Sequence, residues 1–375
     1  MTPLRRVDCH THILPSELTQ DYFKSYSPSE EYVTLKPCQG NCNVIMEKGG
    51  KFFREVEPNC FDAEVRLEEM EEANVGVQVL STVPVMFAYW KNPADALDFS
   101  QRVNDDMISV AEKHPTRFVV LATLPMEHPD LAIQVSSSIF VSLRFTCHFT
   151  IRSRLIVSLS ISLVPQELRR VKQRPCVVGI EIGTNINGTQ LSDARFDPLW
   201  AECERLNAAV FVHPWDMPRP DATKYWLPWL VGMPYETTMA MCSFGFSGVL
   251  DRHPNLRVMF AHGGGSFAGT LGRICHGFEC RPDLVAVDSK KHPREFARQM
   301  WVDSLVHDEQ TFDMMVECFG EDKIVLGSDY PFPLGEQCPG AIVQESRILS
   351  EEAKKRILWD NAFAWMGIDD KPFRS

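Results

Sequence analysis

Short hydrophobic runs alternate along the chain with segments in which apolar residues recur at helical spacing. The runs are almost continuously apolar, as parallel strands buried on both faces require. Eight of them predict strands, at residues 5–12, 76–83, 117–124, 176–183, 208–214, 256–262, 300–305 and 323–330. Helical segments lie between them, at residues 62–73, 92–113, 194–206, 235–250, 266–277, 308–319 and 350–358. This alternation predicts an α/β fold, a (β/α)8 barrel. A doubly wound sheet is the weaker alternative, because no Gly-x-Gly-x-x-Gly sequence follows the first strand.

One long segment interrupts the alternation after the first predicted strand. Residues 14–61 contain clusters of proline, serine, asparagine and glycine and a hairpin-like sequence at residues 46–54. Loops that follow barrel strands lie at the carboxyl-terminal face, so we expect this segment to form a lid or small insertion over an active site. Residues 1–375 are otherwise predicted to form a single barrel domain.

A second segment, residues 135–166, has an anomalous composition where the third outer helix is expected. It contains no Asp, Glu, Lys or Gly and many serines and β-branched residues. Removing it joins residues 132–134 to residues 167–171 and restores an amphipathic helix. Its first and last residues can be encoded by the sequences that bound an intron. Our hypothesis is therefore a retained, translated intron, with a genuine variable loop as the alternative; the sequence of the mature transcript distinguishes the two.

Composition and charge narrow the possible partners and compartment. Hydrophobic residues make up 44% of the chain and charged residues 23%, which is typical of a globular protein with a sizeable core. A net charge of −12 argues against nucleic acid or an anionic membrane as a partner, because both need a basic face. The sequence shows no signal-peptide pattern, and several of its twelve cysteines lie within apolar strand or helix patterns. We therefore expect a reduced protein of the cytosol, without a membrane partner.

Histidines and one aspartate mark the ends of four predicted strands. His10 and His12 end the first strand, and alternate residues of a strand point to the same side, so both imidazoles can reach one metal ion. His213 ends the fifth run, His262 the sixth and Asp329 the eighth. A lone histidine after a strand is more often structural, but together these residues occur where a barrel carries its active site. Imidazoles with a carboxylate suit Zn²⁺ better than Mg²⁺ or Ca²⁺, while Fe²⁺ and Co²⁺ stay open as alternatives.

Longer motifs around these residues resemble the amidohydrolase superfamily, and within it a decarboxylase branch. The motifs lie at residues 80–90, 213–216, 225–238, 262–265, 272–278 and 329–336. The resemblance extends over the whole chain except residues 135–166. It implies non-oxidative loss of CO₂ from a small conjugated dicarboxylate of tryptophan catabolism. Two alternatives remain: a metal-dependent hydrolase or deaminase of the same superfamily, and an inactive protein if the anomalous segment prevents folding.

At matching positions the resemblance implies four ligands for one zinc ion per subunit: His10, His12, His213 and Asp329. His262 is then the catalytic acid/base, which takes a proton from a water molecule at the metal. The hydroxide so formed adds to the conjugated substrate, and a carboxylate can leave as CO₂. Residues 177–183, the fourth strand, contain no lysine, so we expect neither a bridging carbamylated lysine nor a second metal.

The resemblance also assigns the contacts with the substrate. Arg54 in the hairpin and Arg273 after the sixth strand match carboxylate-binding arginines, because a planar guanidinium can hold a carboxylate bidentately. Arg273 is expected to reach the active site of a neighbouring subunit, which implies that a homodimer is the active form. Trp215 and Phe332 are expected to form walls of the pocket around a flat substrate.

Overall fold

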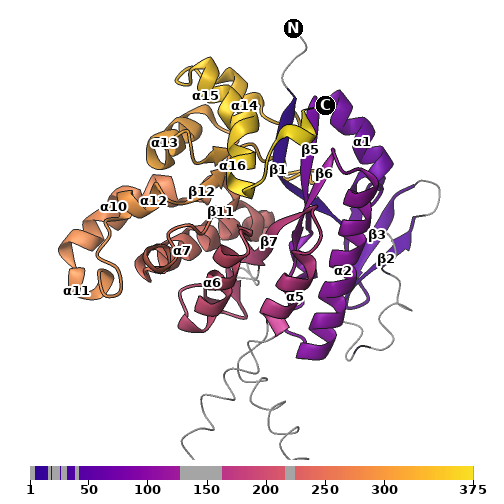
Figure 1. Ribbon diagram of the computed structural model, residues 1–375, viewed down its shortest axis with the longest axis horizontal. Helices are drawn as coiled ribbons and strands as arrows, with labels where there is room; N and C mark the ends of the chain where they lie inside the picture. Colours follow the sequence, from indigo (N-terminus) through magenta and orange to yellow (C-terminus); the bar gives the residue numbers. More distant parts are fainter. Residues whose placement is uncertain are drawn as a thin grey trace, which may run out of the picture.

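Eight parallel strands form one sheet whose order follows the sequence. The structure, a computed structural model, describes residues 5–15, 18, 26, 32–38, 42–126, 163–215 and 224–374. The strands are β1 (Arg6–Ile13), β5 (Val75–Thr82), β6 (Phe118–Ala122), β7 (Val177–Gly183), β10 (Ala209–His213), β11 (Val258–Phe260), β12 (Trp301–Asp303) and β13 (Ile324–Val325). The prediction of a (β/α)8 barrel is confirmed (Figure 1).

Backbone hydrogen bonds join the first strand to the segment that follows β13 and so close the barrel. The N–H of His12 donates to the carbonyl of Tyr330 at 2.8 Å, and the N–H of Asp329 donates to the carbonyl of His10 at 2.9 Å. The closure therefore places the ends of the first and eighth strands, both of which carry predicted ligands, side by side.

The last three barrel strands are shorter than the sequence predicts. For β11 the reason is the backbone at its carboxyl end. His262 has a φ of 57°, in the left-handed region, so the extended chain cannot continue to that residue. β11 therefore ends at Phe260, two residues before the predicted boundary.

Helices surround the barrel and follow the strands in the predicted order (Figure 1). The longer ones and the final pair are α1 (Ala63–Glu72), α2 (Pro93–Lys113), α5 (Leu163–Val171), α6 (Asp197–Arg205), α7 (Met233–Phe246), α10 (Phe267–Cys280), α13 (Glu309–Phe319), α15 (Glu351–Lys355) and α16 (Asn361–Met366). Their starts are encoded locally, since the side chain of Asp62 caps α1 and that of Ser350 caps α15. Within the described residues, no helix is long and apolar enough to cross a membrane.

The interior of the barrel is filled by inward-facing strand residues. They include Val77, Val79, Val119, Leu121, Ala209, Phe211 and Met259, which pack with residues of α16. Cys9 belongs to this cluster, and the ring of His10 lies 4.9 Å from that of Phe211. Strict alternation would place these two neighbours on opposite faces. The pairing of β1 with β5 shifts between Asp8 and Thr11, and this irregularity turns His10 into the barrel.

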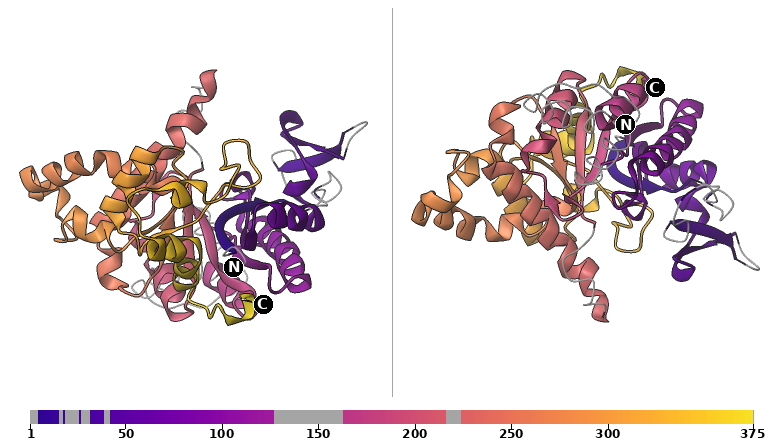
Figure 2. Two further views of the ribbon diagram at one scale, coloured as in Figure 1. Left: turned by 90° about the horizontal axis from the view of Figure 1, so that it is seen from above. Right: turned by 90° about the horizontal axis from the view of Figure 1, so that it is seen from below.

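A three-stranded antiparallel sheet is inserted between β1 and α1. It consists of β2 (Val33–Pro37), β3 (Val44–Lys48) and β4 (Lys51–Val56). β3 and β4 form a hairpin around Gly49 and Gly50, whose φ values of 60° and 68° suit a two-residue turn that glycine adopts without steric cost. Figure 2 shows this sheet, in indigo, standing out at the side of the barrel.

Most of the anomalous segment, residues 135–162, lies outside the described residues. Its last residues, 163–166, form the first turn of α5, and residues 167–171 continue that helix. The carboxylate of Glu167 accepts a hydrogen bond of 2.8 Å from Asn104 on α2, which anchors α5 in the outer ring. The end of the segment therefore joins an outer helix and lies outside the barrel interior.

Candidate metal centre

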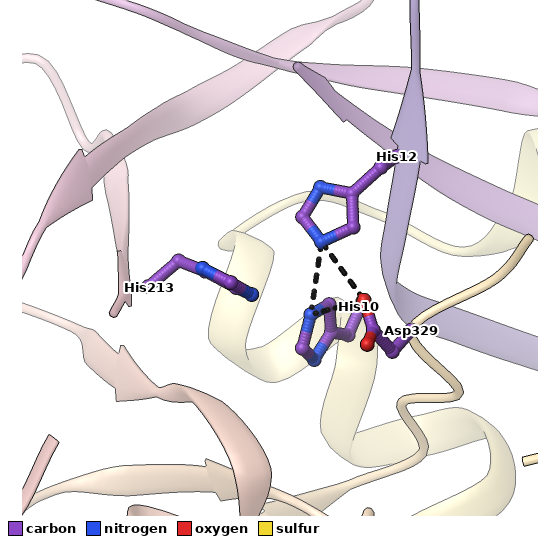
Figure 3. A group of neighbouring side chains, drawn as sticks. All are labelled: His10, His12, His213 and Asp329. Carbon is purple, nitrogen blue, oxygen red and sulfur yellow. Dashed lines mark hydrogen bonds and ion pairs between the residues drawn. The ribbon is translucent and has the colours of Figure 1, made fainter. Parts of the chain in front are cut away.

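Four predicted ligands converge at the carboxyl-terminal edge of the barrel (Figure 3). His10 and His12 come from β1, His213 ends β10, and Asp329 follows β13. One candidate ligand atom from each lies within 4.8 Å of the others, and the three histidines are buried. Among the described residues this is the single group of three or more such side chains that could hold a metal ion.

Hydrogen bonds to the δ-nitrogens fix how the imidazole rings face the centre. Nδ1 of His12 lies 2.9 Å from the carbonyl oxygen of Thr82, and Nδ1 of His213 lies 3.0 Å from that of Pro214. Because a carbonyl oxygen can only accept, both δ-nitrogens carry the proton, which leaves each Nε2 with a free lone pair. Each ring is thus held in the tautomer that a metal ligand needs.

The ε-nitrogens lie so close together that a cation between them suits the geometry. Nε2 of His10 and Nε2 of His12 are 3.2 Å apart, and Oδ1 of Asp329 lies 3.1 Å from Nε2 of His12. Nε2 of His213 is buried and has no hydrogen-bond partner among the described residues. Converging lone pairs and a carboxylate repel one another unless a positive charge lies between them. Three imidazole nitrogens and one carboxylate oxygen therefore fit a divalent metal such as zinc.

The ionisation of these groups supports the same interpretation. Burial alone would raise the pKa of Asp329, but its hydrogen bond with His12 and the nearby imidazoles lower it to about 2. Burial lowers the pKa of His12 and that of His213. Burial also acts to lower the pKa of His10, but the hydrogen bond and charge of Asp303 outweigh it and raise that pKa. At neutral pH the site therefore offers one carboxylate with mostly neutral imidazoles.

His262 lies beside the four ligands but is not one of the converging group. Its ring centre is 5.1 Å from that of His10 and 5.0 Å from that of His213. Its Nδ1 is buried and has no hydrogen-bond partner among the described residues. Burial and the neighbouring His10 lower the pKa of His262 to about 4, so the ring is neutral at physiological pH. A neutral imidazole with an unpaired nitrogen can accept a proton at this position.

An apolar cavity opens beside the candidate ligands, and His12, His213 and Asp329 line it. Its walls include the predicted residues Arg54, Trp215 and Phe332, together with Phe53, Val83, Pro84, Val85, Trp226, Trp229 and Met233. The Arg54 guanidinium lies 4.7 Å above the Phe332 ring, whose centre is 5.8 Å from that of His12. Phe332 therefore lies near both His12 and Arg54, and the charge of Arg54 also interacts with the carboxylate of Asp329. Arg54 therefore supplies a positive charge in the wall of the cavity.

Arg273 is the one predicted substrate residue that lies away from this cavity. It is exposed on α10 and does not line the cavity of its own chain. The contact of Arg273 with the active site of another subunit therefore stays a prediction.

Sequence reasoning missed several buried charged residues beneath the ligands. Asp303, at the end of β12, lies 2.7 Å from Nδ1 of His10, and Asp8 accepts hydrogen bonds from the N–H of Ser328 and from its hydroxyl. Arg66, fully buried on α1, donates to the carbonyl of His12. Asp303 lies inside the seventh predicted strand, residues 300–305, and a charged residue within an otherwise mostly apolar run was the one signal the sequence offered.

A closed (β/α)8 barrel with three histidines and an aspartate at its carboxyl edge defines a metal-dependent enzyme of the amidohydrolase type. The amidohydrolase family matches residues 7–368. A 2-amino-3-carboxymuconate-6-semialdehyde decarboxylase from Dictyostelium discoideum is 44% identical, with 98% of this chain and 93% of the relative covered. The enzyme of that name from Caenorhabditis elegans is 38% identical, with 98% and 95% covered.

A solved structure shows the same fold. The 5-carboxyvanillate decarboxylase of Novosphingobium aromaticivorans, complexed with manganese, has a TM-score of 0.69 at 17% identity, with 98% of this chain and 97% of that one covered. The chain belongs to the amidohydrolase family and, within it, to the 2-amino-3-carboxymuconate-6-semialdehyde decarboxylases, which are metal-dependent carboxy-lyases. The resemblance found in the sequence motifs is thereby confirmed.

Proposed function

We propose that this chain is a zinc enzyme that converts 2-amino-3-carboxymuconate 6-semialdehyde to 2-aminomuconate 6-semialdehyde and CO₂. The proposed role is in tryptophan catabolism by the kynurenine pathway, where the reaction diverts material from quinolinate and NAD synthesis. The observation that carries the proposal is the convergence of three buried imidazoles and Asp329 beside an apolar cavity with an arginine in its wall. The 44% and 38% identity to decarboxylases of this name, over 98% of this chain in each case, supports the choice of substrate.

Each group of the cavity has a part in the proposed reaction. A divalent metal held by His10, His12, His213 and Asp329 would lower the pKa of a water molecule and polarise the substrate. Neutral His262 would take up a proton and later return it to the product. Arg54 would hold one substrate carboxylate, and the ring of Phe332 beneath it would guide the flat, conjugated chain towards the metal ligands. The apolar walls suit departure of uncharged CO₂.

Zinc is the proposed metal because three of the four ligand atoms are imidazole nitrogens. Zinc is a borderline-soft ion that these ligands suit, whereas manganese prefers more oxygen ligands. Manganese is the alternative, because the structurally similar 5-carboxyvanillate decarboxylase was solved in complex with manganese. Metal analysis of the purified protein, followed by reconstitution with each ion, tests the choice; full activity with manganese alone would contradict it.

A second copy of this chain is the proposed partner. Exposed apolar side chains follow the segment that leads into α7, at 40–77% exposure: Tyr225, Trp226, Leu230, Val231, Tyr235 and Met239. The N–H of Ser266, at the start of α10, donates to the hydroxyl of Thr238 on α7, so this apolar face adjoins the helix that carries Arg273. A dimer through this face would cover the apolar residues and bring Arg273 to the partner.

Mixed subunits test the shared site. Arg54→Ala and Arg273→Ala subunits are each expected to be weakly active, and mixing them should restore part of the activity if one intact site combines both arginines. No recovery in mixed dimers that are shown to form would place Arg273 outside the partner's site.

The proposed compartment is the cytosol. All cysteines of the described residues are free thiols, which suits a reducing environment. Cell fractionation checks this proposal, and recovery of the protein outside the cytosolic fraction would contradict it.

Expression of the chain with and without residues 135–166 tests the proposed reaction. With the metal-loaded protein, the near-ultraviolet absorbance of the substrate should fall as the substrate is consumed. One molecule of CO₂ should be released per molecule of substrate. No CO₂ from either metal-loaded form would exclude decarboxylation. Release of ammonia instead would indicate a deaminase of the same superfamily.

A further inference from the structure

Asp303 occupies a central position under the site. It is the last residue of β12, and its side chain is fully buried inside the barrel. No sequence motif singled it out, and it is not among the residues that line the cavity. Yet its two carboxylate oxygens lie within hydrogen-bonding distance of the ring of His10 and of the backbone N–H groups of His262 and Gly263.

On one side Asp303 holds a ligand ring. Its Oδ2 lies 2.7 Å from Nδ1 of His10, and both side chains are fully buried. A charge-assisted hydrogen bond of this kind fixes the tautomer and the orientation of the imidazole and strengthens Nε2 as a metal ligand. Nδ1 of His12 and Nδ1 of His213 have backbone carbonyl partners, and the carboxylate oxygen Oε1 of Glu181 lies 3.8 Å from Nδ1 of His12. Among the described residues, His10 is therefore the ligand whose Nδ1 lies within hydrogen-bonding distance of a carboxylate.

On the other side Asp303 holds the backbone of the acid/base residue. The N–H of His262 donates to Oδ2 at 2.9 Å, and the N–H of Gly263 donates to Oδ1 at 2.8 Å. His262 and Gly263 both have left-handed φ values, of 57° and 61°. This conformation is unfavourable for a non-glycine residue, so it persists where surrounding contacts hold it.

Packing locks the same turn from the β12 side. A Cβ on Gly263 would lie 2.2 Å from Cγ1 of Val306, three residues after Asp303. The N–H of Leu305 also donates to Oδ1 of Asp303, at 3.1 Å. The carboxylate therefore accepts from three backbone N–H groups, which follow β11 and β12, and faces Nδ1 of His10 on β1, so it helps to fix the position of His262.

We propose that Asp303 is a positioning residue that couples the metal ligand His10 to the proton-transferring His262. Through one carboxylate it sets the orientation of a ligand ring and the place of the acid/base ring relative to it. The part that concerns His262 rests on the proposed decarboxylation, whereas the part that concerns His10 does not.

The test compares Asp303→Asn with a matched loss of a buried carboxylate elsewhere. An asparagine side chain has one acceptor oxygen and cannot serve all four donors. Glu167→Gln is the control, because Glu167 is also fully buried and hydrogen-bonded but lies between α5 and α2. Metal affinity is measured by competition with a chromophoric chelator, and kcat and KM are measured at saturating metal and divided by bound metal.

Asp303→Asn is expected to weaken metal affinity by roughly 10–100-fold and to lower kcat per bound metal by a similar factor. KM should change by less than about threefold, because the residue does not line the cavity. Glu167→Gln should lower only the melting temperature. Normal kcat per bound metal in Asp303→Asn, or an equal loss of kcat in Glu167→Gln, would overturn the coupling.

A measurement on the unaltered protein covers the case in which Asp303→Asn does not fold. The Nδ1–H proton of His10 should resonate far downfield in the NMR spectrum of the metal-bound protein, as expected for a proton shared with a carboxylate. Absence of that resonance would overturn the His10 contact. If the unaltered enzyme releases no CO₂, the proposed function fails, while chelator competition and this resonance still decide whether Asp303 supports His10.

Discussion

The candidate metal ligands come from barrel strands or from the segment that follows β13, whereas several residues that line the adjoining cavity come from segments inserted between the strands. His12 is 1% exposed and its ring is held by a backbone carbonyl, but Trp226 is 40% exposed and Phe52, next to the lining residue Phe53, is 69% exposed. Arg54 lies on β4 of the inserted sheet. In the proposed reaction the barrel would therefore supply the chemistry, and the more exposed insertions would supply recognition of the substrate.

Loss of Asp329, the carboxylate among the candidate ligands, is expected to have the largest effect on the metal site in the barrel. Asp329→Ala removes the single negative charge among the four converging ligands and leaves the other three ligand atoms facing one another. We expect at least about 3 kcal/mol of lost metal binding, roughly a hundredfold in affinity, and with it the loss of activity. Metal content after dialysis and CO₂ release measure the two effects. Retention of stoichiometric metal would show that Asp329 is not a ligand.

His262→Ala should separate chemistry from metal binding at the same buried site. The ring of His262 lies next to the ligand rings but outside the converging group, so the metal should remain bound. Loss of the acid/base should lower kcat by about 10²–10⁴-fold. Metal content and kcat are compared with those of Asp329→Ala. Equal loss of metal in both variants would instead make His262 a ligand.

The same contrast explains what could be predicted from the sequence. His213 and Asp329 each follow an apolar run, and the parallel arrangement of barrel strands brings the ends of such runs to one edge. Their convergence could therefore be inferred before any coordinates. The pairing of Val33–Pro37 with the predicted hairpin could not, because a short strand on an exposed insertion leaves little periodicity to detect.

Asp303 shows a different limit. A charged residue inside the seventh predicted strand was visible in the sequence, but its role depends on a 2.7 Å contact with His10, which is 293 positions away in the chain. No local pattern encodes that distance. Likewise, the left-handed backbone of His262 shortened β11 relative to its hydrophobic run, because apolar residues report burial and not backbone angle.

Arg54→Ala tests the part of the cavity that the inserted sheet contributes. Loss of a charge-assisted hydrogen bond to a substrate carboxylate should raise KM by about 10–100-fold, and metal content should be unchanged. The control is Phe52→Ala on the same strand, whose side chain is 69% exposed and should leave KM within about twofold. Steady-state kinetics with metal analysis separate the two variants. A fall in metal content for Arg54→Ala would mean that the metal site and this part of the cavity are not independent.

Lowering the pH should weaken metal affinity gradually, and one ligand, His10, should take up a proton first. A metal ligand must be unprotonated, so affinity falls as the pH falls through the pKa of each imidazole, by about tenfold per pH unit for one proton. The pKa of His10 is raised by Asp303 above its ordinary value, whereas burial lowers those of His12 and His213. The first loss on lowering the pH should therefore follow a single proton and start above pH 6.5, with steeper loss only at lower pH.

Chelator competition across the pH range measures this slope, and Asp303→Asn is the matching control. Without the carboxylate the pKa of His10 should fall, so the onset of metal loss should move to lower pH even though the affinity at neutral pH is weaker. The pKa of Asp329, about 2, keeps its carboxylate ionised throughout this range, so that ligand should not contribute to the slope. If the logarithm of the metal affinity instead falls by two or three units per pH unit from the first loss of metal, the imidazoles take up protons together. That result would show that Asp303 does not set His10 apart from the other ligands.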